Sequence, residues 1–147
     1  MTNSESGNYI TIPEFLDQAI LFEARSAALY TRMAKDFPEG SQEQLLTMLA
    51  REEHRHMQVL QEEKERPHAD EYFQFAPELS LSMPEPPAEG TGLSELLDFA
   101  IERERQSARI YEQAAAVAKR EFRQLLEGLA TFEREHEERL ISLRDNY

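Results

Sequence analysis

The sequence predicts an all-α protein: a four-helix bundle made of two repeated helical hairpins that are joined by a long crossover. Three observations lead to this fold class. Apolar residues recur at helical spacing in four stretches, the two halves of the chain repeat each other, and proline and glycine gather between the halves. The chain has 147 residues, so we expect a single domain over 1–147 with one hydrophobic core.

The first hairpin is expected to contain helices over about 12–36 and 41–66. Thr11 and Glu14 have the spacing of a capping box at the start of the first helix. Ser41 begins a second sequence of this kind at the start of the next helix. The link between the helices is short and contains a proline and a glycine, which predicts an antiparallel pair.

The second hairpin is expected over about 93–117 and 121–145, with a boundary that contains no proline or glycine. Residues 1–9 are expected to be frayed. The crossover, 67–92, is too rich in proline for a long helix. It is also too apolar for a free linker, so we expect its apolar residues to pack along the bundle: Tyr72, Phe73, Phe75, Leu79 and Leu81.

The composition excludes several classes of function. A net charge of −13 argues against a nucleic-acid partner, because phosphate contacts need clustered lysine and arginine. The chain has no cysteine, which excludes disulfides, thiolate metal sites and thiol nucleophiles. No apolar run approaches a membrane span, and the polar N-terminus lacks a signal-peptide core. We therefore expect a cytoplasmic protein without a membrane partner, in which bound cations neutralise part of the surplus carboxylate charge.

An internal repeat relates the two hairpins. The first and third helices share ten residue types at an offset of 81, and the second and fourth share eight at an offset of 80. The one-residue slip falls in the hairpin turn. Two hairpins that each have one apolar side can bury it by packing together with a pseudo-twofold axis. The polar residues that recur on the inward faces are Glu23/Glu104, Tyr30/Tyr111, Glu53/Glu133 and His56/His136.

The four glutamates and two histidines of this set form a candidate metal site. Glu53-x-x-His56 and Glu133-x-x-His136 each place a carboxylate and an imidazole one helical turn apart. With one further Glu from each of the other helices, this is the arrangement of carboxylate-bridged dimetal sites. Glu23 and Glu104 would be terminal ligands, while Glu53 and Glu133 would bridge. Four carboxylates balance two divalent ions, and oxygen ligands with one imidazole per metal suit iron or manganese.

Other interpretations of these residues stay open. A duplicated but purely structural bundle could keep the same polar residues, provided that it satisfied all six without metal. Tyr30 and Tyr111 lie seven residues after Glu23 and Glu104, and each phenol leans back towards the metal layer. They would bond a ligand Glu or act as redox-active groups, or they would only fill the core. His54 and His68 are expected to be solvated.

On these motifs the chain resembles the ferritin-like superfamily, and most closely the rubrerythrin-type diiron-carboxylate proteins, over roughly 12–145. The resemblance implies a ferritin-like bundle with two Fe ions, with Mn or Zn as alternatives. It also implies oxidation of Fe(II) by hydrogen peroxide or O2, in oxidative-stress defence or iron handling, and a homodimer.

Two departures from the rubrerythrin pattern stand out. Typical members carry a rubredoxin domain whose iron is held by four cysteines, and this sequence has none, so an external electron donor is expected. They also carry an extra Glu three residues before the third-helix ligand, where this chain has Ile101. This weakens the expectation of efficient peroxidase activity. The leading hypothesis is a diiron oxidoreductase of the peroxidase or ferroxidase type, and the alternative is a dimetal-binding module or adaptor with little or no turnover.

Overall fold

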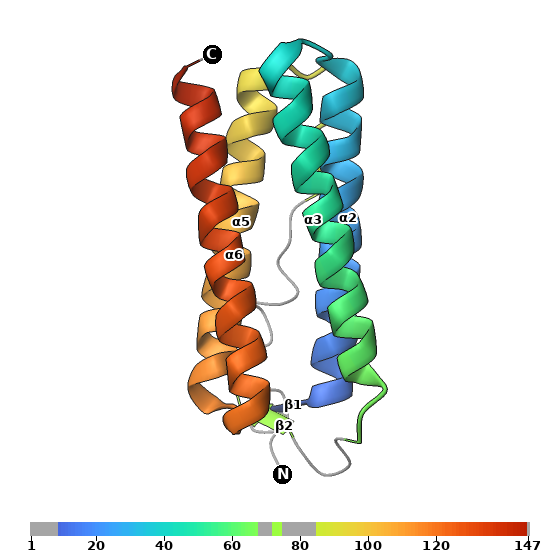
Figure 1. The fold of residues 1–147 in the computed structure, drawn as a ribbon, viewed down its shortest axis with the longest axis vertical. Helices are drawn as coiled ribbons and strands as arrows, with labels where there is room; N and C mark the ends of the chain where they lie inside the picture. Colours follow the sequence, from blue (N-terminus) through green and yellow to red (C-terminus); the bar gives the residue numbers. More distant parts are fainter. Residues whose placement is uncertain (1–8, 68–71, 75–84, 147) are drawn as a thin grey trace. The chain divides into compact units, whose positions relative to one another are not determined.

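Two antiparallel helical hairpins dominate the computed structural model (Figure 1). The first contains α2 (Ile12–Asp36) and α3 (Gly40–Lys64), and the second contains α5 (Leu93–Val117) and α6 (Arg120–Asp145). The structure describes residues 9–67, 72–74 and 85–146. The chain divides into two compact units, Ile12–Asp70 and Met1–Thr11 with Glu71–Tyr147, so each hairpin is treated by itself. That the whole chain is one domain stays a prediction.

Helices α2 and α3 are joined through a tight turn that depends on Gly40. The backbone N–H of Glu39 donates to the carbonyl of Phe37 at 2.9 Å, and Gly40 follows with a φ of +51°. Only glycine adopts this left-handed region without steric cost. The predicted capping box at Ser41 was wrong: the helix begins one residue earlier, and Glu39 is its N-cap without a side-chain hydrogen bond. The helix also ends at Lys64 rather than Arg66.

Helices α5 and α6 are joined by two residues in ordinary extended conformation. Ala118 has φ −87° and ψ 157°, and Lys119 has φ −78° and ψ 163°. Both pairs of angles lie in the broad β region that any L-residue adopts. The connection therefore needs neither proline nor glycine, and only the internal repeat located this boundary in the sequence.

Each helix buries an apolar stripe. In the first hairpin, Leu16 on α2 and Leu46 on α3 are completely buried. In the second, Leu97 on α5 and Leu126 on α6 are equally buried. Alanines recur between the large residues on both hairpins, which lets paired helices approach closely. No helix in the described part of the chain has a stretch apolar enough to cross a bilayer.

The sequence did not predict the short antiparallel pair of strands β1 (Tyr9–Thr11) and β2 (Tyr72–Gln74). Tyr9 therefore belongs to a strand rather than to a frayed end, and Thr11 is a partner of Tyr72. Strand β2 lies beside α5, so this part of the crossover does contact a helix. The expected packing of the crossover side chains from Tyr72 to Leu81 lies outside the described side chains.

Candidate metal centre

The hairpin α2–α3 brings one trio of ligand-type side chains together. Glu23 comes from α2, while Glu53 and His56 lie one turn apart on α3. Their exposed fractions are 0%, 0% and 4%, so none of them is a solvated surface group. The Nδ1 atom of His56 lies 3.5 Å from Glu23 Oε1 and 3.2 Å from Glu53 Oε1. Each residue offers a ligand atom within 4.8 Å of those of the other two.

The hairpin α5–α6 brings the equivalent trio together. Glu104 comes from α5, while Glu133 and His136 come from α6. Their exposed fractions are 1%, 0% and 0%. The Nδ1 atom of His136 lies 3.5 Å from Glu104 Oε2, and the ligand atoms of all three residues again lie within 4.8 Å of one another. The repeat in the sequence is therefore a repeat in side-chain geometry.

The donor set and its spacing fit a metal ion. Two ligand atoms that bind one ion at about 2.1 Å, with angles near 90–110°, lie about 3.0–3.5 Å apart. The nitrogen–oxygen separations of 3.2 and 3.5 Å match this range. A His–Glu ion pair would also give such distances. However, each trio holds two carboxylates for one imidazole, so within the trio even a protonated histidine leaves one negative charge to be neutralised at a buried site.

The helical repeat explains why these side chains share a face. Glu23 and Tyr30 are seven residues apart on α2, as are Glu104 and Tyr111 on α5, and seven residues are close to two turns. Both tyrosines are buried, with exposed fractions of 1% and 2%. Their part in turnover stays a prediction. Ile101 is also buried, so an apolar side chain occupies the position of the extra rubrerythrin carboxylate.

Three buried polar residues near the trios were not singled out from the sequence. Ser26 and Ser107 each lie three residues after the ligand Glu of their helix and are 2% exposed. Their identity in both repeats was the signal that could have marked them. Arg103 is 3% exposed, with its guanidinium carbon 5.7 Å from the centroid of the Phe99 ring. Its counterpart in the first repeat is Phe22, so the repeat gave no signal for a buried arginine.

His54 and His68 are the two histidines outside the trios. His54 is exposed on α3, as expected. His68 lies outside the described residues.

Comparison with known proteins adds a family and a fold. The rubrerythrin family model matches residues 14–144. A crystal structure from Thermotoga maritima, provisionally described as a ferritin-like diiron-carboxylate protein, superposes with a TM-score of 0.79 at 18% identity. The match covers 94% of this chain and 97% of the other. No curated protein matches the sequence significantly.

Proposed function

Because the chain belongs to the rubrerythrin family, we propose that its two buried Glu-Glu-His trios together hold two metal ions, with iron as the native metal. The observation that carries the proposal is the duplicated trio itself, with carboxylate oxygens 3.2–3.5 Å from a histidine Nδ1 at positions shielded from water. The fold is that of a ferritin-like four-helix bundle, which is the setting in which such ligand sets occur.

The roles proposed for the side chains follow from charge and position. Glu23 with His56, and Glu104 with His136, would each serve one metal as terminal ligands, while Glu53 and Glu133 would bridge. Four carboxylates carry −4 and two divalent ions carry +4, so loading removes the cost of burying unpaired charge. Manganese or zinc would satisfy the same charge balance, so only direct metal analysis separates them from iron.

We further propose that the loaded protein oxidises Fe(II) with hydrogen peroxide or O2. Bound iron would supply the electrons: two Fe(II) and two protons reduce one H2O2 to two H2O and leave two Fe(III). The residues of the chain hold the ions, neutralise their charge and exclude bulk water. Tyr30 and Tyr111 are proposed to orient a ligand carboxylate or to exchange an electron. An external donor must return the two electrons, and a cytoplasmic homodimer is part of the proposal.

An anaerobic Fe(II) titration of the metal-stripped protein tests binding, and a peroxide or O2 pulse then tests oxidation by stopped-flow absorbance. We expect saturation near two Fe per chain and a fast rise of near-UV Fe(III) absorbance. Glu53→Gln and Glu133→Gln should each weaken iron binding by about 100-fold or more, exceeding the loss typical of groups that only support a ligand. The exposed Glu135→Gln is the matched control and should bind normally. No stoichiometric binding would refute the metal site.

The second candidate is a metal-binding module with little or no turnover, and one observation favours it. Ile101 is buried where the family resemblance leads one to expect a carboxylate that supports the peroxidase cycle. Stoichiometric iron binding followed by slow oxidation would select this function. Ile101→Glu should then accelerate oxidation by peroxide without increasing the number of bound ions.

A further inference from the structure

A groove of about 510 Å³ runs along the hairpin α2–α3, outside the metal-ligand trio. We call it the basic groove and define it by its rim residues Thr31, Lys35, Thr47, Arg51 and His54. Its floor contains two buried alanines, Ala34 and Ala50. A volume of this size is within the range of sites that bind small molecules, about 300–1,000 Å³.

Within the described residues, the cations of this groove have no ion-pair partner: no carboxylate lies within ion-pair distance of Lys35, Arg51 or His54. The single acidic residue of the lining, Glu43, accepts a hydrogen bond from Thr47 Oγ1 at 3.3 Å. In a chain of net charge −13, exposed cations that gather without carboxylate partners are unexpected.

Helix geometry makes two of these cations converge. Side chains on a helix lean towards its N-terminus, and α2 and α3 run in opposite directions. Lys35 lies near the end of α2, so it leans away from the turn. Arg51 lies two turns or more into α3, so it leans back towards the turn. Both line the same groove, each one helical turn after a threonine hydroxyl, Thr31 or Thr47.

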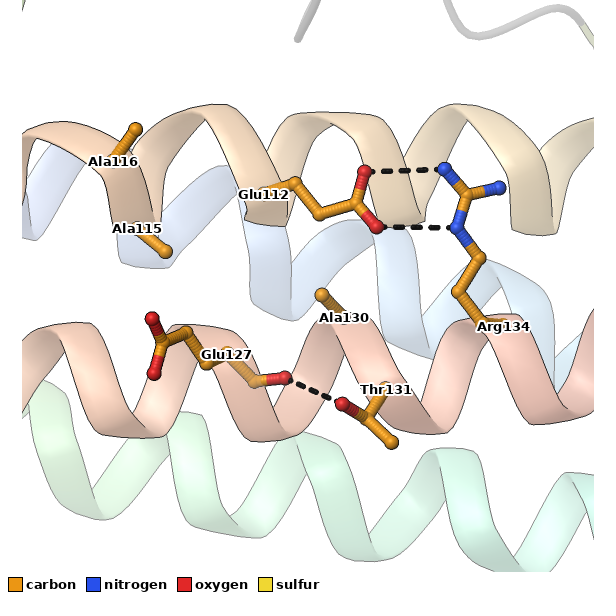
Figure 2. Close-up of a pocket in the computed structure, with 7 residues that line it drawn as sticks. All are labelled: Glu112, Ala115, Ala116, Glu127, Ala130, Thr131 and Arg134. Atoms are coloured by element: carbon orange, nitrogen blue, oxygen red, sulfur yellow. Dashed lines mark hydrogen bonds and ion pairs between the residues drawn. The ribbon is translucent and has the colours of Figure 1, made fainter.

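The equivalent groove on α5–α6 shows what a neutralised version looks like (Figure 2). Its volume is about 470 Å³, and its floor again contains two alanines, Ala115 and Ala130. There Arg134 donates two hydrogen bonds of 3.1 Å to the carboxylate of Glu112, so the two opposite charges neutralise each other. These hydrogen bonds raise the pKa of Arg134 above its ordinary value.

The repeat aligns the two grooves and shows a change of charge at each of five rim positions. Thr31 and Thr47 replace the glutamates at the equivalent positions of the second hairpin, and Lys35 and Arg51 replace uncharged residues. The corresponding pairs are Thr31/Glu112, Lys35/Ala116, Thr47/Glu127, Arg51/Thr131 and His54/Arg134. The floor alanines are identical. Four of these five changes make the first groove more positive, while the apolar floor is kept. His54 in place of Arg134, and the lining residue Glu43 where the second hairpin has Arg123, change the charge in the other direction.

We propose that the basic groove binds a small organic anion. Its carboxylate or phosphate group is held by Lys35 and Arg51, with Thr31 and Thr47 as further donors, and a short apolar part rests on Ala34 and Ala50. Charged hydrogen bonds to such groups are the strong ones, and arginine matches both anions with two parallel donors. This site is separate from the metal ligands, so its existence does not depend on the proposed redox function.

The test is a titration of the full ¹⁵N-labelled chain, loaded with diamagnetic Zn(II), with butyl phosphate, butyrate and butanol as probes. We expect saturable shifts of backbone amides around Thr31, Lys35 and Arg51 with an anionic probe, and none with butanol. The tighter of the two anions identifies the preferred group. Equal shifts with butanol would show that only the apolar floor binds, and would overturn the assignment of an anion site.

Variants separate a built site from general attraction to surface cations. Lys35→Ala and Arg51→Ala should each weaken binding about tenfold, the loss expected for one charge-assisted hydrogen bond. Thr31→Glu places a carboxylate where the second hairpin has Glu112 and should abolish binding. Arg134→Gln removes a cation from the other groove and is the matched control. Unsaturable shifts, or equal weakening by Arg134→Gln, would overturn the proposal. All four residues are exposed or half-buried, and circular dichroism checks that the variants fold.

Discussion

The two hairpins are alike on the inside and different on the outside. Both bury a Glu-Glu-His trio, a tyrosine two turns after the ligand Glu, and alanines at matching positions. On the outer surface they share one ion pair, Asp17–Lys64 in the first hairpin and Asp98–Arg144 in the second. Further ion pairs cross from α5 to α6, as in Arg105–Glu137 and Arg134–Glu112.

This difference shows which positions the chemistry constrains. A buried carboxylate needs a partner of fixed geometry, and the Glu and His residues of the trio are the same in both hairpins. An exposed ion pair contributes only about 0–1 kcal/mol, so its position tolerates a threonine in one hairpin and a glutamate in the other. The outer faces can therefore differ in residue type without a large loss of stability, and the proposed anion site lies on one of them.

The largest effect should come from matched core truncations. Leu49→Ala and Leu129→Ala remove equivalent leucines that are 0% and 3% exposed. Each should lower the free energy of unfolding by about 2–5 kcal/mol. Urea denaturation of the metal-loaded protein measures this. If the two cores are equivalent, the two losses should agree within about 1 kcal/mol. A larger difference would show that the cores of the two hairpins differ in stability.

An intermediate effect is expected at the turns, where the hairpins differ. Gly40→Ala should cost about 1–2 kcal/mol of unfolding free energy, because an L-residue is forced to a φ of +51°. A Cβ at Gly40 meets no atom within 4 Å, so the cost is backbone strain alone.

Gly128→Ala is the matched control for this turn. It lies inside α6, also with no atom within 4 Å of an added Cβ, and should stabilise by about 0.5–1 kcal/mol. Thermal unfolding of both variants measures the difference. The same sign for both would contradict the role given to the turn.

The smallest effect should come from the outer ion pair. Arg134→Gln should lower the free energy of unfolding by about 0.2–1 kcal/mol, and less at high salt. The hydrogen bonds to Glu112 and Glu137 raise the pKa of Arg134 in the folded state, so its contribution is complete below the unfolded-state pKa and is lost only as the pH rises through the raised folded-state pKa. Denaturation at pH 6 and pH 9 should therefore give the same loss. His54→Gln, at the equivalent position, should change stability by less.

Sequence reasoning succeeded where a long periodic signal existed. Helix α2 begins and ends at the expected residues, and the ferritin-like fold follows from the recurrence of residues such as Glu23 and Glu104. It failed where three or fewer residues decide the structure. Ser41 has the pattern of a cap, but the φ of Gly40 starts the helix one residue earlier. Strands of three residues, such as Tyr9–Thr11, are too short to show an alternating pattern.

Exposed pairs could not be predicted for a different reason. Glu112 and Arg134 are 22 residues apart, and their contact depends on how the two helices of the hairpin are rotated and aligned. Many other pairings of Arg and Glu on α5 and α6 fit the same sequence. The candidate site escaped this ambiguity, because burial leaves few faces on which a Glu and a His can lie.

The strand pair has a consequence for how the chain is assembled. Thr11 ends β1 opposite Tyr72, and the unit that contains α2 and α3, Ile12–Asp70, lies between these two residues in the sequence. Paired residues in antiparallel strands lie about 4.5–5.5 Å apart, so this unit leaves and re-enters its host at almost one point. In the sequence, the first hairpin is thus an insertion into the unit that contains the strand pair and the second hairpin. The two chain ends of this insertion are as close together as the strand residues that flank a two-residue hairpin loop. Such close ends allow a unit to be grafted, excised or circularly permuted.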